Sequence, residues 1–216
     1  MAYQRYQDAL GPAHAQTIML RAIVGSMTPD RKQARALHDK CAALDDQLRG
    51  ECVYEAAWIA DEDGDIAEAT RLMASHPQQD SPSGRIAQAY VKMRRDGLTA
   101  QLRHELEAMA RTPGKVFYEH LYAGDAWMVL ALGSTGTAAD AAWESANERA
   151  VAARISVYRR RVVRSDAELA QRWRTSRPKH AVAHAMRALA WYRASASDQA
   201  LVRLLEAITA TGPDSR

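Results

Sequence analysis

Helix-breaking residues recur along this chain at nearly regular intervals. Long helix-forming stretches are interrupted by clusters of Ser, Pro, Gly and Asp near residues 29, 64, 97, 133, 165 and 195. A second set of breaks falls near residues 50, 76–84, 112–114 and 177–178. Each period therefore consists of a helix, a turn, a second helix and a longer turn. A repeat of about 34 residues made of two short helices is typical of stacked helical hairpins.

The composition supports a helical protein. About a fifth of the 216 residues are alanine, whereas the chain has only 11 glycines and 7 prolines. Alanine is the strongest helix former, and Gly and Pro are the strongest breakers, so we expect an all-α fold. No Gly-rich or Ser-rich linker divides the chain, and we expect residues 1–216 to form one repeat-like domain. The stretch 138–163 contains neither Gly nor Pro, which predicts one long helix that interrupts the period.

The stretch 184–213 (HAMRALAWYRASASDQALVRLLEAITATGP) resembles a tetratricopeptide repeat. The positions that match the small, aromatic, large and closing residues of that repeat are Ala188, Trp191, Ala200, Leu204, Ala207 and Pro213. Residues 53–77 match the same pattern at fewer positions. The resemblance implies an array of antiparallel hairpins that form a right-handed α-solenoid, with a groove that receives a peptide or a partner helix.

Several carboxylates surround Gly64 in the stretch ADEDGDIAEA (60–69). A calcium loop of the helix-loop-helix kind needs Gly at position 6 and Glu at position 12. A loop that starts at Asp61 has apolar residues at both positions. Gly64 instead suits the left-handed end of one helix, and Asp65 suits the N-cap of the next, with Glu68 completing a capping box. The sequence therefore predicts a turn between two helices and not a metal site.

Histidines and cysteines supply the other candidates for chemistry. His180 and His184 share one helix face at a spacing that can hold a metal, but no third ligand lies near them in the sequence. We expect both Cys41 and Cys52 to be free thiols. Because His38 lies one helical turn before Cys41 and could activate its thiol, a reactive Cys41 is the alternative. No linear motif indicates catalysis or a cofactor. We expect a protein that is not an enzyme and holds no cofactor, with a small enzyme or ligand sensor as the alternative.

Positive charge concentrates between Arg154 and Lys179, where nine Arg or Lys residues face only Asp166 and Glu168. Arginine binds carboxylate or phosphate with two parallel hydrogen bonds and stacks on aromatic rings. The predicted binding residues of this basic segment are Arg160, Arg161, Arg164, Arg172, Trp173 and Arg174. We expect the segment to be a solvated, positively charged face, and binding of an acidic protein segment or of nucleic acid are the alternatives.

Together these patterns predict a scaffold or adaptor that binds a peptide or a partner helix. The first twenty residues lack the cationic start and apolar core of a secretory signal. The longest apolar run, residues 126–132, has seven residues, against roughly 20 for a membrane-spanning helix. We therefore expect a cytoplasmic protein without a membrane partner. The sequence leaves the oligomeric state open.

Overall fold

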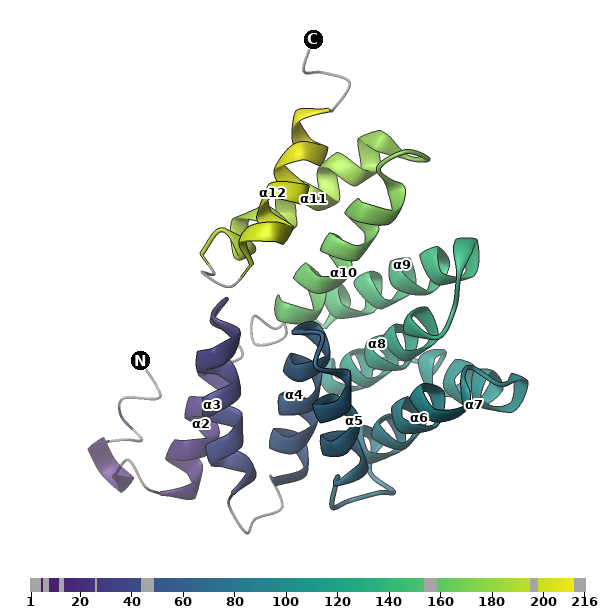
Figure 1. Cartoon of the computed structure of the whole chain (residues 1–216). Coiled ribbons are helices and arrows are strands. Elements are labelled where there is room, and N and C mark those ends of the chain that lie inside the picture. The colour runs from purple at the N-terminus through teal and green to yellow at the C-terminus, as the bar shows by residue number, and fades with distance from the viewer. Residues whose placement is uncertain are drawn as a thin grey trace. The chain divides into compact units, whose positions relative to one another are not determined.

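The computed structural model of the protein is built of helices joined by turns (Figure 1). It describes residues 5, 8–11, 14–25, 27–43, 49–153, 159–194 and 198–211, and none of these lies in a β-strand. The helices are α2 (Ala15–Gly25), α3 (Arg31–Ala42), α4 (Arg49–Glu62), α5 (Ile66–Ala74), α6 (Pro82–Asp96), α7 (Ala100–Ala110), α8 (Phe117–Leu132), α9 (Gly136–Ala152), α10 (Arg159–Trp173), α11 (Pro178–Tyr192) and α12 (Gln199–Ala210). The all-α prediction is confirmed. Within the described ranges, no helix combines the length and the apolar character that crossing a membrane requires.

Contacts between helices divide the chain into two units, residues 1–97 and 98–216. In unit 1 the helices α2 to α6 each pack on the next, and α4 also contacts α6. In unit 2 the helices α7 to α12 pack in the same sequential way, and α10 also contacts α12. Because short connections make consecutive helices antiparallel neighbours, each unit consists of helical hairpins. One repeat-like domain over residues 1–216 stays a prediction.

The spacing of the helices agrees with a two-helix repeat over much of the chain. Every second helix, starting with α2, begins at residue 15, 49, 82, 117, 159 or 199. The first three intervals between these starts are nearly equal and close to the period of helical-hairpin repeats. The last two intervals are longer. The first of these two contains α8 and α9, which have 16 and 17 residues, more than any other helix of the described chain. The breaks in the sequence thus locate most of the turns.

The stretch 138–163 forms parts of two helices, α9 and α10, and the predicted single helix is wrong. The side-chain amide of Asn147 donates to the hydroxyl of Ser165 over 2.8 Å. A continuous helix would place these two residues about 27 Å apart. The turn predicted near Ser165 is also wrong, because Ser165 is buried within α10 and its hydroxyl donates to the carbonyl of Arg161 over 2.9 Å.

The acidic stretch forms the turn between α4 and α5, as predicted. Gly64 has a φ of 81°, in the left-handed region where a residue with a Cβ is strained. Asp65 caps α5 by accepting a hydrogen bond from the backbone N–H of Glu68 over 3.1 Å. The reciprocal half of the predicted capping box is absent, because the Glu68 carboxylate instead binds Arg35 and Arg71 and the Asp65 N–H donates to a carbonyl of α4.

The tetratricopeptide pattern is met on α11 but not on α12. Ala188 and Trp191 are buried, as the small and aromatic positions of the first helix require. Ala200 and Ala207 are exposed, although the repeat needs small residues where its second helix faces the first. Pro213 lies outside the described residues. The structure is therefore compatible with a helical-repeat fold in general, without matching this repeat in detail.

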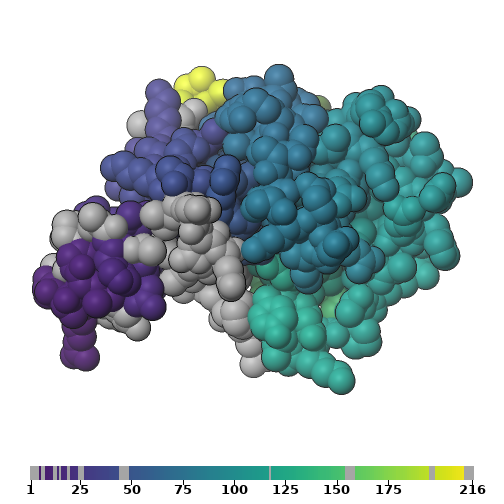
Figure 2. Space-filling view, turned by 90° about the horizontal axis from the view of Figure 1, so that it is seen from below, coloured from purple at the N-terminus to yellow at the C-terminus, as the bar shows by residue number. Residues whose placement is uncertain are grey.

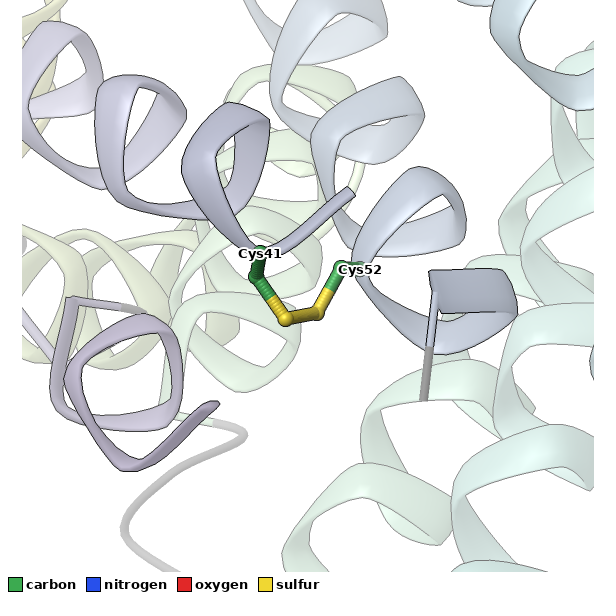
Figure 3. The surroundings of a disulfide bond; sticks show 2 residues. All are labelled: Cys41 and Cys52. Carbon is green, nitrogen blue, oxygen red and sulfur yellow. A yellow bond between two sulfur atoms is a disulfide. The ribbon is translucent and has the colours of Figure 1, made fainter. Parts of the chain in front are cut away.

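A disulfide joins Cys41 of α3 to Cys52 of α4 (Figure 3), and the Cα atoms of the two residues lie 5.7 Å apart. Both cysteines are buried, and together with Ala22 they form a small apolar core on which Ile18 and Ala42 pack. The expectation of free thiols is therefore wrong. A thiol at Cys41 activated by a neighbouring histidine is excluded for the oxidised protein.

Candidate functional site

Three of the arginines predicted to bind a partner are buried. Arg160, Arg161 and Arg164 expose only 3, 4 and 8% of their surface. They therefore do not form an exposed positive patch, although the concentration of positive charge in the basic segment made one possible. Two further members of the basic segment, Arg154 and Tyr158, lie outside the described residues.

The buried arginines connect α10 to its neighbours in unit 2. The Nε atom of Arg161 donates to Asp125 of α8 over 3.2 Å, and both side chains are buried. The guanidinium of Arg160 lies 5.8 Å from the ring centre of Trp191 on α11, and that of Arg164 lies 6.0 Å from the ring of Trp143 on α9. A guanidinium within about 6 Å of an aromatic ring is attracted to its face. These contacts indicate that the three arginines hold helices together.

A second buried carboxylate, Asp166, links α10 to α9 and α11. Its side chain is 1% exposed and accepts a hydrogen bond from Asn147 over 3.2 Å. The guanidinium of Arg187 donates to both carboxylate oxygens, with the shortest distance being 2.8 Å. Since a buried carboxylate is costly unless it is paired and hydrogen-bonded, Arg187 and Asn147 explain how Asp166 is tolerated in this place.

His184 completes this cluster. Its Nδ1 atom lies 2.6 Å from Asp166 Oδ1 and 2.6 Å from Arg187 Nη2. Nδ1 therefore donates to the carboxylate when it carries a proton and accepts from the guanidinium when it does not. A buried carboxylate that fixes a histidine is also found in general-base catalysis. Here Arg187 neutralises the same carboxylate, which favours a structural role for the cluster.

The two histidines singled out in the sequence do not come together as a metal site. His184 is engaged by Asp166, and the ring of His180 packs edge-on against Trp173 with centroids 6.2 Å apart. In the part of the chain that the structure describes, no group of three or more His, Cys, Asp or Glu residues is arranged to hold a metal.

Apart from Arg159 at the start of α10, the exposed cations of the basic segment lie in the turn that follows α10 and in the first turn of α11. Residues 174–180 are all exposed and include no acidic residue. We define the basic turn as Arg174, Arg177 and Lys179. The guanidinium of Arg177 stacks over the ring of Trp173, 4.7 Å from its centre, while Trp173 itself is 2% exposed. Of the predicted binding residues, Arg174 thus remains accessible, and two of the three cations here were not singled out in the sequence.

Arg172 is the remaining predicted binding residue, and it is partly neutralised. Its guanidinium pairs with Asp140 of α9 and donates to the carbonyl of Gly136 over 3.3 Å. The Nη1 atom of Arg177 lies 4.0 Å from a carboxylate oxygen of Glu144. These acids remove some of the positive charge at this end of α10, but they leave Arg174 and Lys179 without an ion pair among the described residues.

Unit 1 contains a polar cluster that no pattern in the sequence indicated. The hydroxyl of Tyr90 on α6 donates to Asp61 of α4, and Arg94 donates to the same carboxylate over 2.6 Å. Burial, and then the neighbouring Asp61 carboxylate, raise the pKa of the Tyr90 phenol. Asp61 belongs to the acidic stretch, so one of its carboxylates faces inward and fastens α6 to α4.

The chain matches no model of a known protein family, no curated protein and no solved structure.

Proposed function

We propose that the protein is a scaffold that binds an acidic segment of a partner protein through the basic turn. The observation that carries the proposal is the continuous exposure of residues 174–180, which hold three cations and no carboxylate. Charged groups of opposite sign on two partners speed their encounter and fix their relative position. An acidic segment is therefore the partner that this surface suits.

The stacking of Arg177 on Trp173 supports the same proposal. A guanidinium held over a buried ring is pre-oriented, so less side-chain entropy is lost when it forms hydrogen bonds with a carboxylate. Trp173 is in turn fixed by its contacts with His180 and His184 of α11. The basic turn thus presents at least one arginine on a rigid support.

We further propose that the hairpins of the chain form a tetratricopeptide-like solenoid. The nearly equal intervals between the starts of α2, α4, α6 and α8 support this arrangement, and the exposed Ala200 and Ala207 count against it. A crystal structure tests it directly, because a solenoid requires each hairpin to be related to the next by a similar rotation. Hairpins related by dissimilar rotations would refute it.

Fluorescence anisotropy with a labelled peptide of ten glutamates tests the binding proposal. We compare the wild type with the variant Arg174→Glu/Arg177→Glu/Lys179→Glu at low and high salt. The wild type is expected to bind the peptide more weakly as salt rises, because exposed charges are screened. The variant should bind about tenfold more weakly at low salt, which corresponds to the loss of about 1.4 kcal/mol.

The control variant is Lys32→Glu/Arg85→Glu/Lys115→Glu, which changes the net charge equally at three other exposed cations. It should bind the peptide nearly as well as the wild type. Equal weakening in both variants would mean that the peptide responds only to net charge, and the basic turn would not be a site. A single-stranded oligonucleotide of equal charge that binds more tightly, through the same three residues, would favour the nucleic-acid alternative.

A further inference from the structure

The contact between α3 and α4 in unit 1 is held by a different bond at each end. The Nη1 atom of Arg31, the first residue of α3, lies 3.8 Å from the carboxylate of Glu62, the last residue of α4. Cys41, near the end of α3, is joined by the disulfide to Cys52, near the start of α4. The attraction in an ion pair is offset by lost hydration, so the ion pair holds its end less firmly than the covalent bond holds the other.

Apolar packing adds little to the attachment of α3. The structure describes every residue of this helix, and those that are buried are Ala34, His38 and Cys41. The buried core that α2 and α3 share with α4 consists of Ala22 and the two cysteines. In both Figure 1 and Figure 2, α2 and α3 (purple to indigo) lie at one edge of unit 1. Since a small core usually needs a covalent staple, the disulfide is the main attachment of this hairpin.

The larger buried side chains of unit 1 lie on α4, α5 and α6. The rings of Trp58 and Tyr90 join α4 to α6, with centroids 5.8 Å apart. Burial of apolar side chains is the main stabilising term in folding, and parts of a protein with fewer such contacts open separately from the rest. We therefore expect α2 and α3 to open before α4, α5 and α6. The described residues of unit 1 with the largest fully buried side chains are Tyr54, Trp58, Ile59, Met73, Ile86 and Tyr90.

The disulfide limits how far α3 can move from α4. Two cysteines can be bridged only while their Cα atoms lie within about 7 Å of each other, and here these atoms are 5.7 Å apart. In the oxidised protein the end of α3 therefore stays beside the start of α4. Reduction removes this limit but leaves two small apolar side chains in place, so it changes the tether and not the composition of the core.

We propose that the disulfide is a redox switch, and that its reduction lets α2 and α3 open away from α4 while α4, α5 and α6 stay folded. A dithiol reductant supplies two electrons and two protons. The S–S bond then breaks to give two thiols, and the reductant itself becomes a disulfide.

Opening of α3 uncovers an apolar face of α4. Ala56 and Ile59 lie between Cys52 and Glu62 on the side that α3 covers, because residues three or four apart share a helix face. In the oxidised protein Ala56 and Ile59 are 0 and 1% exposed. The two redox states therefore differ in the apolar surface that unit 1 presents to the solvent.

Hydrogen–deuterium exchange of the full chain, read by mass spectrometry, tests this inference. The disulfide is closed with oxidised glutathione, which the loss of two hydrogens from the intact mass verifies, and part of the sample is reduced with dithiothreitol. The amides of α3 are expected to exchange at least about tenfold faster after reduction, since a tether of this kind shifts an opening equilibrium by at least that factor. In the reduced protein α3 should also exchange at least about tenfold faster than α5 and α6, relative to the unfolded chain, because the opening is local.

Low concentrations of urea distinguish local opening from global unfolding. Urea should hardly change the exchange of α3 in the reduced protein, because local opening exposes little surface, whereas exchange through global unfolding becomes faster. The variant Cys41→Ala/Cys52→Ala is the control for the reagent, and its α3 should exchange rapidly with and without dithiothreitol. The comparison between the two redox states of the wild type does not depend on this variant.

Three results would overturn the inference. Equal protection of α3, α5 and α6 in the reduced protein would show that the disulfide stabilises only the fold as a whole. Exchange of α3 that is unchanged by reduction would show that the hairpin stays closed without the disulfide. A disulfide that does not form in oxidised glutathione would show that the two cysteines are not a redox pair.

Discussion

The guanidinium of Arg161 lies 3.2 Å from the carboxylate of Asp125, and the two side chains are only 5 and 0% exposed. These residues are 36 positions apart, on α10 and α8. An arginine that charge counting assigns to the surface is therefore part of the interior, where its charge is balanced by a carboxylate from another helix.

Removal of one member of this pair should destabilise the protein strongly. Arg161→Ala leaves Asp125 as a buried charge without this partner, and such changes typically cost about 3–5 kcal/mol. Urea denaturation followed by circular dichroism measures the loss of unfolding free energy. Arg172→Ala is the matched control, because its pair with Asp140 is about a quarter exposed and such pairs contribute about 0–1 kcal/mol.

A double variant checks the physical reason for this loss. Arg161→Met/Asp125→Leu removes both charges and should recover much of the stability lost in Arg161→Ala, because apolar replacements avoid the desolvation cost. If Arg161→Ala and Arg172→Ala prove equally mild, the buried pair does not contribute in the way the structure indicates.

Asp166 allows a second test of how unit 2 is held together. Asp166→Ala should cost about 3 kcal/mol or more, because it removes the acceptor shared by Asn147, His184 and Arg187. A double-mutant cycle with Arg187→Ala separates the contribution of the ion pair from the remainder. Additive losses in the cycle would show that Arg187 and Asp166 do not interact in solution.

Local features of the chain were predictable, and contacts between distant segments were not. The conformation of Gly64 and the N-cap at Asp65 depend on neighbouring residues, so short patterns located them. The burial of Arg160, Arg161 and Arg164 depends on which sides of α10 are covered by other helices, and charge counting carries no such information. Neither Asp125 nor Asp61 gave a sign of its buried partners, because a carboxylate in a helix does not reveal a partner that lies far along the chain.

The break between α9 and α10 was also not predictable from local sequence. Absence of Gly and Pro over residues 138–163 predicted a continuous helix, yet α9 and α10 pack side by side, with Asn147 bonded to Ser165. Intrinsic propensity is a weak prior that tertiary packing overrides. Ser165 was expected in a turn but lies within α10. Its local sequence does not distinguish it from the serines that do lie in turns.

The disulfide gives a prediction on stability and redox state. It closes a loop over a sequence separation of 11 residues, for which the loss of chain entropy in the unfolded state gives about 3 kcal/mol. Cys41→Ala/Cys52→Ala should lower the unfolding free energy by about that amount and make it insensitive to dithiothreitol. The wild type should lose a similar amount when it is reduced.

Thiol titration of the unfolded, unreduced protein decides whether the pair is oxidised in its host. Disulfides persist in oxidising compartments and are rare in the cytosol. The disulfide between Cys41 and Cys52 therefore conflicts with the expected cytoplasmic location. No reactive thiol per chain would confirm the disulfide. Two reactive thiols would restore the expectation of free cysteines and remove the predicted effect of dithiothreitol.

Glu68 gives a prediction on acid stability. Hydrogen bonds from Arg71 and then Arg35, partly opposed by burial, lower the pKa of the Glu68 carboxyl from 4.5 to about 2. A carboxyl whose pKa is lower in the folded state stabilises the protein above its unfolded pKa. That contribution is fully present above pH 4.5 and is lost as the pH falls toward 2.

Unfolding free energies of the wild type and Glu68→Gln, measured by urea denaturation from pH 7 to pH 2, test this. The wild type should be the more stable protein at neutral pH, and the difference should shrink between pH 4.5 and pH 2, because the protonated carboxyl no longer pairs with the two arginines. Glu148→Gln, at an exposed glutamate of α9, is the control for loss of one negative charge. A difference that is constant over this pH range, or that grows toward pH 2, would show that Arg35 and Arg71 do not hold Glu68 in solution as they do in the structure.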